Sequence, residues 1–551
     1  MNRLHEASTR MQDHLTNTPS GALMRLRLAT PRQHESALIA PPWEALTDLV
    51  QTNATSLSEA DVNLNGMPMR ALRQQVRSSV MAEAAAYTSS LIGKDVAPPN
   101  LARVIVTGHQ PELFHAGVWA KNFATAGLAR ATNATALNLI IDNDTVASTR
   151  IKVPVGTRHV PTIEWLAFDG ARPQQPWEEA SILEPTVFRS FADRVSRRIR
   201  ECWGFEPLIT SSWPAAITQM KHSPRLFDCL SAARVAVERS QGLQNLEIPM
   251  SRVCNTPGFD YFLVFLLGRL PEFHAVYNSA IREYRHAYHM RSITHPVPEL
   301  DTQGEWLELP FWIWRAGDHR RLRPYARKCG LQVEVRAGSD ILARLPIAQD
   351  AEPSSALSIL SELRTNGLRV RTRALTTTLF TRLFLADLFI HGIGGAKYDA
   401  MTDRICEEFF GIRSPRFATI SATVLLPLGQ PYPITADAVH RQEQRIRDLR
   451  FNPDRYILNT QFDTLSLARE KKEILSRLTD RRPSKVEHRR LAALNAALYI
   501  HLRPLNDALK EDLARLKKEL QANLVLTDRE FSWCLQPSDV AIPFFRRQFL
   551  E

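Results

Sequence analysis

The segment that most constrains the fold is a short apolar run followed by a Gly/His/Gln/Pro loop and a stretch with helical spacing. The apolar run covers residues 104–106, the loop contains Gly108 to Pro111, and the helical spacing covers residues 123–129. This order predicts a strand, a loop and a helix. In an open α/β sheet such a loop lies at the carboxyl end of its strand, where backbone amides and a helix N-terminus face a ligand. We therefore look for chemistry first in this loop.

A second apolar run follows the predicted helix. Residues 136–141 are mostly apolar and end in Asp142, Asn143 and Asp144. Two strands that flank one helix form a βαβ unit, whose parallel strands are joined by a right-handed crossover. The two loops that follow these strands then lie at the same edge of one sheet. The fold class that this pattern indicates is α/β with a parallel sheet.

Several side chains in the first loop are suited to chemistry. His109 and His115 can stabilise a developing negative charge or exchange protons near neutral pH. Lys121 lies about two helical turns further on and could reach an anionic group. The alternative is that Gly108 and Pro111 only shape a turn while the histidines bond to the backbone. We favour function, because several polar residue types gather within a few positions.

The acidic end of the second strand has two interpretations. Asp142, Asn143 and Asp144 occupy the position where carboxylates orient a substrate hydroxyl or amine, bind a ribose or hold Mg²⁺. Asp and Asn are also common in helix caps and Asx turns, so both interpretations stay open here. On the functional interpretation, Asp142 and Asp144 orient an amine or a metal-bound nucleotide.

A glycine-rich loop in the second half of the chain forms a further candidate site. The apolar spacing of residues 378–389 predicts a helix before it. Its glycines allow a phosphate or carboxylate to approach the backbone closely, Lys397 adds charge, and Asp399 could cap the following helix. Loops also use glycine for ordinary turns. The ligand contacts that we predict here are Arg373, Gly392, Gly394, Gly395, Lys397 and Tyr398.

The composition bounds the class of protein. A length of 551 residues allows two or three structural units. A hydrophobic content of 44% and a charged content of 23% are typical of soluble globular proteins, and no segment approaches the roughly 20 apolar residues of a membrane helix. The first residues lack the apolar core of a secretion signal, so we expect a cytoplasmic location.

Charge, cysteines and histidines narrow the partners. The formal net charge is +11, with basic residues spread along the chain among acids. This distribution favours an anionic small substrate, with nucleic acid as the weaker interpretation. The six cysteines stand singly, which favours buried apolar roles. His286, His289 and His295 have no neighbouring Cys and no HExxH pattern, so we assign no metal site.

The first three quarters of the chain divide into a lead-in and a core. Residues 1–100 predict a helical lead-in, with an amphipathic helix at 69–92. The core extends over residues 101–435. Within it, residues 150–370 are expected to form an inserted subdomain, and residues 306–314 alternate around aromatic side chains as a strand does.

Long charged helices follow the core. Residues 436–527 predict a helical hairpin, in which leucines recur at spacings of three and four over residues 502–524. Pro504 interrupts the preceding helix, and residues 462–478 are the expected opposite arm. Such an arm serves dimerisation or covers a site. Residues 528–551 are expected to return to the core.

Two stretches of this sequence resemble one known family. The segment TGHQPELFHAGVWAKNFATAGLA resembles the Thr-Gly-Gln-Gln loop and following helix of the cysteine-adding enzymes of bacillithiol biosynthesis (BshC). The stretch RALTTTLFTRLFLADLFIHGIGGAKYDAMTDRICEEFFGIRSPRFATISATVLLP is similar to the second signature of that family. The two signatures occur in the right order and precede a helical hairpin. The resemblance covers about residues 100–145 and 370–525.

The resemblance implies a fold and a reaction. The fold is a Rossmann-like core with insertions, a coiled-coil arm used for dimerisation and a nucleotide-sized pocket. The reaction adds cysteine to glucosaminyl malate and forms an amide bond. The positions that match the family's motifs are Gly108, Gln110, Phe114, Gly117, Lys121, Arg373, Gly394 and Gly395. The chain departs from the family at three places. His109 replaces a glutamine. Residues 142–144 replace a Glu-Asp-His-Asp type strand end, and residues 396–398 replace a Pro-Gly-Glu run.

The function that we predict is a ligase or transferase that joins cysteine or another amine to a small carboxylated substrate of the sugar-malate type. His109, His115, Asp142 and Asp144 are the predicted catalytic residues. The remaining predicted contacts with substrate or nucleotide in this half of the site are Gly108, Gln110, Phe114, Gly117, Lys121, Asn122 and Asn143. A nucleotide such as ADP or ATP with Mg²⁺ and a homodimer formed through the arm are expected partners. The alternatives are a nucleotidyl- or glycosyl-type transferase on the same fold and a non-catalytic dimeric scaffold.

Overall fold

A six-stranded sheet forms the centre of the protein. The computed structural model describes residues 28–551, except 293, 296, 348–352, 458–461 and 479–480. The strands follow the order β1-β17-β16-β4-β5-β8, in which β1 is antiparallel to its neighbour and the other pairs are parallel. Their bounds are β1 (Ser36–Ala40), β4 (Val104–His109), β5 (Thr135–Ile140), β8 (Leu246–Pro249), β16 (Leu388–His391) and β17 (Ala418–Thr423). The predicted parallel α/β class is confirmed.

The order of the parallel strands reverses once. From β4 the chain adds β5 and β8 to one side of the sheet, and it later adds β16 and β17 to the other side. The boundary between β4 and β16 is therefore a topological switch point, where loops at the carboxyl ends of the two strands lead away in opposite directions. The predicted βαβ unit is confirmed as β4, α4 (Ala116–Thr132) and the parallel strand β5.

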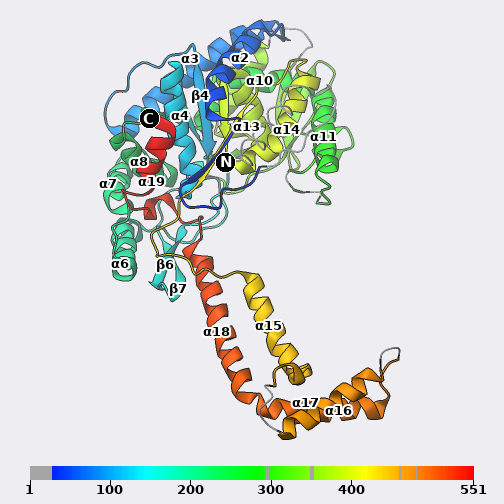
Figure 1. Cartoon of the computed structure of the whole chain (residues 1–551). Helices are drawn as coiled ribbons and strands as arrows, with labels where there is room; N and C mark the ends of the chain where they lie inside the picture. Colours follow the sequence, from blue (N-terminus) through cyan, green and yellow to red (C-terminus); the bar gives the residue numbers. More distant parts are fainter. Residues whose placement is uncertain (1–27, 293, 296, 348–352, 458–461, 479–480) are drawn as a thin grey trace.

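Helices cover both faces of the sheet. Successive residues of β4 point to opposite faces, so its side chains pack against both helix layers. Ile105 belongs to a hydrophobic cluster with α4, whereas Val104 and Val106 belong to a second cluster with α3 and α10. Figure 1 shows α4 and α10 on opposite sides of β4. The core helices are α2 (Leu46–Glu59), α3 (Met69–Ile92), α4, α8 (Leu226–Ser240), α10 (Pro257–Gly268), α11 (Leu270–Ala287), α13 (Ala374–Phe380) and α14 (Ile393–Phe409). The amphipathic helix predicted at 69–92 is confirmed as α3; residues 1–27 of the lead-in lie outside the described residues.

The helix predicted at residues 378–389 is only partly correct. Helix α13 ends at Phe380, a π-helical turn covers Thr381–Leu385, and the chain then forms the central strand β16. All four residues of β16 are buried, because neighbouring strands and both helix layers enclose it. A strand buried on both faces has a continuous apolar sequence, which periodicity alone does not distinguish from a buried helix. The glycine loop therefore follows a strand.

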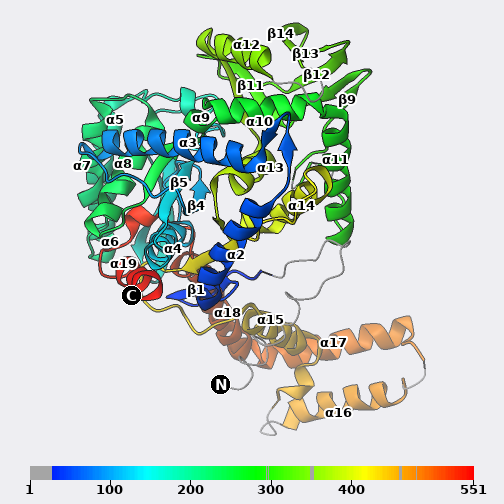
Figure 2. The ribbon, with the colours of Figure 1, turned by 90° about the horizontal axis from the view of Figure 1, so that it is seen from above.

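Two insertions lengthen the core. The first contains β6 (Arg150–Thr157), β7 (Val160–Ala167), α5 (Pro185–Arg189), α6 (Phe191–Trp203) and α7 (Ile209–Met220). The second contains β9 (Thr302–Gln303), β10 (Trp306–Glu308), β11 (Phe311–Arg315), β12 (Pro324–Cys329), β13 (Gln332–Ala337), β14 (Asp340–Pro346), α12 (Ser354–Thr365) and β15 (Leu368–Thr372). Figure 2 shows the second insertion beside α10 and α11. The strand predicted at 306–314 is two strands, which break at Leu309 and Pro310.

A helical arm projects from the body (Figure 1). Its helices are α15 (Ala436–Phe451), α16 (Phe462–Ser476), α17 (Lys485–His501) and α18 (Arg503–Leu526). Helix α18 packs along α15, and α16 packs along α17. The pairing predicted between residues 462–478 and α18 is therefore wrong. The chain breaks between α17 and α18, beside Pro504, and the two helices leave this point in different directions (Figure 1).

The last residues pack on the core. Phe545 of α19 (Ala541–Phe545) lies with its ring centroid 5.1 Å from that of Phe123 and 5.9 Å from that of Trp119, both on α4. All three side chains are fully buried. In the described part of the chain, no helix is both long and apolar enough to span a membrane.

Candidate functional site

The loops after β4, β16 and β5 meet at one edge of the sheet. Thr107 of β4 lies opposite Ile390 of β16, and its Oγ1 donates a hydrogen bond of 2.9 Å to the Ile390 carbonyl. On the other side of β4, His109 lies opposite Ile140 of β5. Three segments therefore begin at the carboxyl ends of three adjacent parallel strands. They are the loop at residues 108–115 after β4, the glycine loop after β16 and the acidic segment after β5. The structure brings together the segments that carry the predicted site.

His109 is buried at the end of β4. Its Nε2 lies 3.3 Å from Oδ1 of Asn122, its Nδ1 lies 3.2 Å from the Gln110 carbonyl, and its ring packs 4.3 Å from that of Phe114. Burial, followed by the positive charges of Arg234 and Lys121, holds the pKa of His109 well below its ordinary value. The imidazole is therefore neutral near pH 7, and it donates its single proton to one of two acceptors.

A buried ionic network supports His109 from below the sheet edge. Asn122 donates to Oε1 of Glu238 at 2.6 Å, and Arg234 bonds Glu238 at 2.7 Å and Glu247 at 2.5 Å. Glu247 also accepts a hydrogen bond of 2.7 Å from Asn138. All these groups are buried, so they hold Asn122 in one orientation. The sequence signal for this network is weak, since only the i,i+4 spacing of Arg234 and Glu238 on α8 was visible.

His115 lies in a different environment. It is the N-cap of α4, where its Nδ1 accepts a hydrogen bond of 3.0 Å from the Gly117 amide. Its Nε2 lies 3.4 Å from Glu530 in the C-terminal segment. Burial, followed by the charge of Arg529, lowers the pKa of His115 to about 4. Gly117 lets the chain approach closely, because a Cβ there would overlap the Arg529 side chain and the Ala422 carbonyl. His115 therefore serves the start of α4 and shares no hydrogen-bond partner with His109.

Lys121 is enclosed and is only partly protonated at neutral pH. The residue is 4% exposed, and its Nζ donates a hydrogen bond of 2.6 Å to the Gly108 carbonyl. Burial lowers its pKa to about 7. A buried amine with this pKa can accept or release a proton near pH 7, which suits proton exchange better than the predicted electrostatic contact with an anion.

Asp142 and Asp144 face different partners. Asp142 is fully buried, and its two oxygens accept hydrogen bonds from the Ser251 amide, at 2.9 Å, and the Ser251 hydroxyl. Burial, followed by the neighbouring charge of Glu178, raises the pKa of Asp142 to about 7. The two aspartates therefore do not form an open pair of carboxylates for Mg²⁺. Within the residues that the structure describes, no cluster of three or more side chains is arranged to hold a metal ion.

Asp144 links three segments at the site. Its Oδ2 accepts a hydrogen bond of 3.1 Å from Gln110, and its Oδ1 lies 3.1 Å from Nη1 of Arg321. Arg321 also donates to the Asn143 carbonyl at 2.9 Å, and its guanidinium lies 4.6 Å from the ring centroid of Trp312. The second insertion thus supplies an arginine to the sheet edge. Neither Trp312 nor Arg321 was among the predicted site residues.

Arg373 lies against the same tryptophan. Its guanidinium is 4.3 Å from the Trp312 ring centroid, and its Nη2 bonds Glu308 at 2.7 Å. Nε of Arg373 is buried and has no hydrogen-bond partner among the described residues. Asn143 is tied to this segment, because its Nδ2 donates to the Thr372 carbonyl at 2.7 Å. The predicted residues Arg373, Asn143 and Asp144 therefore converge around Trp312.

The glycine loop forms the start of α14. Gly392 is the N-cap, and Gly394 and Gly395 lie in the first turn of this 17-residue helix. The first backbone amides of a helix point outward and carry partial positive charge, so this end fits an anion such as a phosphate. Tyr398 lies one turn further, with its hydroxyl 3.6 Å from the position of a Cβ on Gly394, and Lys397 is exposed.

Asp399 does not cap α14, as the sequence suggested. The helix begins six residues earlier, and Asp399 instead binds Nε2 of His391 at 2.8 Å and Nη1 of Arg382 at 2.5 Å. Burial raises its pKa, but the charges of Arg382 and His391 outweigh burial and hold the pKa of Asp399 well below its ordinary value. The role of His391 was not predicted, although the sequence places it directly before the glycine loop.

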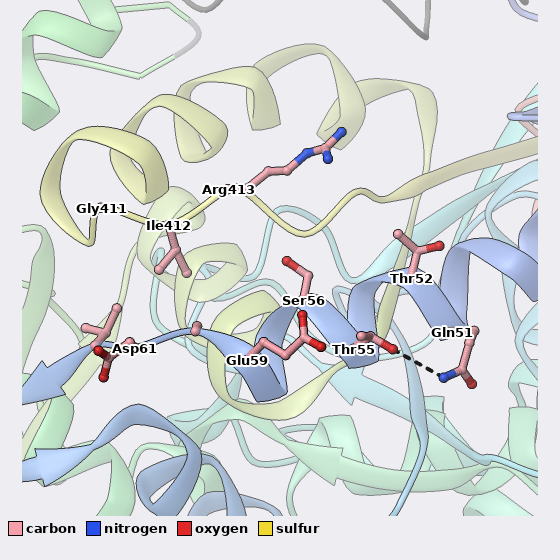
Figure 3. A pocket seen from close by; sticks show the side chains of 11 residues that line it. Gln51, Thr52, Thr55, Ser56, Glu59, Asp61, Gly411, Ile412 and Arg413 are labelled. Atoms are coloured by element: carbon pink, nitrogen blue, oxygen red, sulfur yellow. Dashed lines mark hydrogen bonds between the residues drawn. The ribbon is translucent and has the colours of Figure 1, made fainter.

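A large hollow lies at the opposite edge of the sheet. Its volume is about 740 Å³, and it lies between the end of α2 and the loop after α14 (Figure 3). Nearby, Asn53 of α2 donates to the carbonyl of Asp387, which directly precedes β16. The lining residues are Gln51, Thr52, Thr55, Ser56, Glu59, Ala60, Asp61, Val62, Gly411, Ile412 and Arg413. All of them except Ile412 are half-buried or exposed, so no buried polar group there is fixed in advance for a ligand. We place the candidate site at the carboxyl edge instead.

The fold and this edge define a parallel α/β protein with a polar site at a topological switch point. Comparison with models of known protein families and with curated proteins gives no match for the chain.

Proposed function

We propose that this protein is an enzyme that forms a C–N bond by joining an amine to a small carboxylated substrate, as the cysteine-adding enzymes do, on a Rossmann-like core. One observation supports this proposal above others. The two segments that resemble the signatures of that family, around Gly108 and around Gly394, leave the adjacent strands β4 and β16. They do so where the strand order reverses, which is where parallel α/β proteins bind their ligands.

The groups at this edge suit the chemistry of amide formation. Arg321 and Arg373 present guanidinium groups that pair with carboxylates, and Trp312 keeps both in place. The side-chain carbonyl of Gln110 and the carboxylate of Asp144 lie side by side and could both accept hydrogen bonds from an incoming amine. Lys121, whose pKa is about 7, can take up the proton that the amine loses when its nitrogen attacks the activated carbon.

The start of α14 would hold the phosphates of a nucleotide through the amides of Gly394 and Gly395. A bound nucleoside triphosphate would give its terminal phosphoryl group to the carboxylate and leave as the diphosphate, and attack of the amine on the acyl phosphate would then release inorganic phosphate and a proton. Gly395 and the neighbouring Tyr398 would orient the phosphates beside β4, where Lys121 and His109 lie.

We also propose that the arm mediates a homodimer. Several apolar side chains on its helices are exposed, namely Leu475, Val486, Ile500, Leu505 and Leu524. A second copy of the arm would cover these side chains. Light scattering coupled to size-exclusion chromatography tests this: we expect twice the mass of the chain for the natural protein and a monomer for a Val486→Glu, Ile500→Glu double variant. A monomeric natural protein would rule the dimer out.

A ligand screen followed by a product assay tests the enzymatic proposal. We expect ADP or ATP, cysteine and glucosaminyl malate to raise the melting temperature, because a ligand far above its dissociation constant stabilises by about 2 to 4 kcal/mol. Mass spectrometry then detects the amide product. His109→Ala and Asp144→Ala should lose turnover and keep their fold, whereas Thr55→Ala, in the hollow at the opposite edge, should keep both. A scaffold would bind none of these ligands, and a transferase of another type would respond to sugar nucleotides but not to cysteine.

A further inference from the structure

The last helix of the arm continues into a segment that lies against the candidate site. Residues 528–533, which we call the strap, follow α18 onto the body of the protein, where α19 lies beside α4 (Figure 1). In the strap, Ser532 forms an antiparallel bridge with His115, and the Trp533 amide donates a hydrogen bond of 2.7 Å to the Phe114 carbonyl. The strap therefore holds the end of the loop after β4.

Through this loop, Trp533 acts on one of the two supports of His109. The ring centroid of Phe114 lies 4.3 Å from that of His109, and both side chains belong to the loop side of the site. Because the Trp533 amide bonds the Phe114 carbonyl, the position of the strap determines where the Phe114 ring lies. The aromatic contact with the imidazole therefore depends on the strap.

Through α4, Trp533 also acts on the second support. Its ring centroid lies 5.3 Å from that of Trp119, whose Nε1 donates a hydrogen bond of 2.8 Å to Oε1 of Glu238. The same oxygen accepts a hydrogen bond of 2.6 Å from Asn122, whose Oδ1 lies 3.3 Å from Nε2 of His109. The indole N–H of Trp533 is buried and has no hydrogen-bond partner among the described residues. Its ring therefore acts by packing.

The other end of the strap is tied to the root of the arm. Asn523 of α18 bonds the backbone amide and carbonyl of Tyr432, at 2.8 Å and 2.9 Å, and Asp528 pairs with Lys152 at 2.6 Å. The sequence over residues 523–533 contains no glycine or proline, so it has no residue that favours a flexible joint. A change in the direction of the arm therefore moves the strap.

We propose that the strap couples the arm to the candidate site, with Trp533 as the positioning residue of His109. Both supports of the imidazole, the Phe114 ring and the Asn122 amide, depend on Trp533, and Trp533 follows directly from the arm. A second copy that binds the arm and moves it changes the orientation of His109. This inference rests on the proposed function, since it describes how the same site is regulated.

Nitrogen NMR of the histidine side chains tests the proposal in the full chain without any ligand. The His109 signals are identified by their absence in His109→Gln. Trp533→Leu removes the aromatic contact with Trp119 and should shift these signals, whereas Trp533→Phe keeps a ring in place and should restore them. In Trp533→Leu, amide exchange at residues 113–118 should become about fivefold faster, because the loop loses support comparable to one hydrogen bond. A role in stability alone would lower the melting temperature and leave the His109 signals unchanged.

A matched pair of variants in α18 tests the link to the arm. Asn523→Ala removes both hydrogen bonds to Tyr432 at the root of the arm and should shift the His109 signals, although residue 523 contacts neither support of the imidazole. Arg515→Ala is the control, at an exposed arginine of the same helix whose ion pairs lie within that helix. It should leave the His109 signals unchanged. Melting temperatures of both variants check that the fold is kept.

The outcomes separate this proposal from the proposed function. Unchanged His109 signals in a folded Trp533→Leu variant, or in Asn523→Ala, would overturn the coupling. If Trp533→Leu does not fold, Asn523→Ala decides alone, because residue 523 is only half-buried. None of these measurements contains a substrate. A protein that shows the shifts but forms no amide product therefore contradicts the reaction alone, and one that forms the product without the shifts contradicts only the role of the strap.

Discussion

Replacement of the buried Lys121 by methionine should make the protein more stable, and more so at low pH. The pKa of Lys121 is lowered from 10.5 to about 7 by burial. Because the folded pKa lies below the unfolded one, the unfolded chain binds the additional proton between pH 7 and 10.5. The lysine therefore destabilises the fold fully below about pH 7, and this cost disappears as pH rises toward 10.5.

The magnitude follows from the size of the shift. The lowering of the pKa from 10.5 to about 7 corresponds to a destabilisation of the fold by about 5 kcal/mol at pH 6. At pH 9 this destabilisation is about 2 kcal/mol. Methionine has a similar length but cannot donate to the Gly108 carbonyl, which costs about 1 kcal/mol. With an unfolding entropy of about 2.1 cal/mol/K per residue over the whole chain, the net gain is about 3 °C in melting temperature at pH 6 and about 1 °C at pH 9.

Calorimetric melting at pH 6 and pH 9 measures this difference, with Lys397→Met as the control at an exposed lysine near the same edge. We expect Lys397→Met to have the same melting temperature as the natural protein at both pH values. A Lys121→Met variant that melts lower than the natural protein at pH 6, or whose gain does not fall with pH, would refute the lowered pKa of Lys121. A gain in stability together with a loss of turnover would mark Lys121 as a functional residue.

Three further predictions concern the core around the site. The pKa of Asp142 is raised from 3.8 to about 7, so the folded protein holds this proton more tightly than the unfolded chain. The natural protein should therefore lose about 4 kcal/mol of stability as pH rises from 4 to above 7. Melting curves of Asp142→Asn over the same pH range should lack this loss. Phe545→Ala should lower the free energy of unfolding by about 3 to 5 kcal/mol in calorimetry, because it opens a cavity beneath the C-terminal segment. Arg382→Met should cost about 3 to 5 kcal/mol, because it leaves the carboxylates of Asp399 and Asp403 without their cation; a variant as stable as the natural protein would contradict this pairing.

Strong local patterns made parts of the fold predictable. The amphipathic stretch at 69–92 and the βαβ unit have clear periodicity, and the structure contains both. The stretch at 378–389 was less predictable, because β16 is covered on both faces and its apolar sequence has no period of its own. The pairing of the arm helices also depends on tertiary contacts, since a leucine spacing shows that a helix has a partner without showing which one.

The site was predictable in its location more than in its detail. Strand ends in a parallel sheet share an edge by topology, so the loops around Gly108 and Gly394 could be paired from the sequence. The protonation of Lys121 depends on burial, which sequence does not show. Arg321 lies in the loop between β11 and β12, which has no sequence motif, and it reaches Asp144 only through the fold of the second insertion.

Hydrogen exchange followed by mass spectrometry tests the location of the active edge most directly. The full chain is compared with and without a saturating mixture of ADP, cysteine and glucosaminyl malate. A site between β4 and β16 predicts slower exchange in peptides that cover residues 108–118 and 391–399, with no change in peptides from the hollow at the opposite edge. Slower exchange confined to residues 51–62 and 411–413 would contradict this account and would place the ligand in that hollow instead.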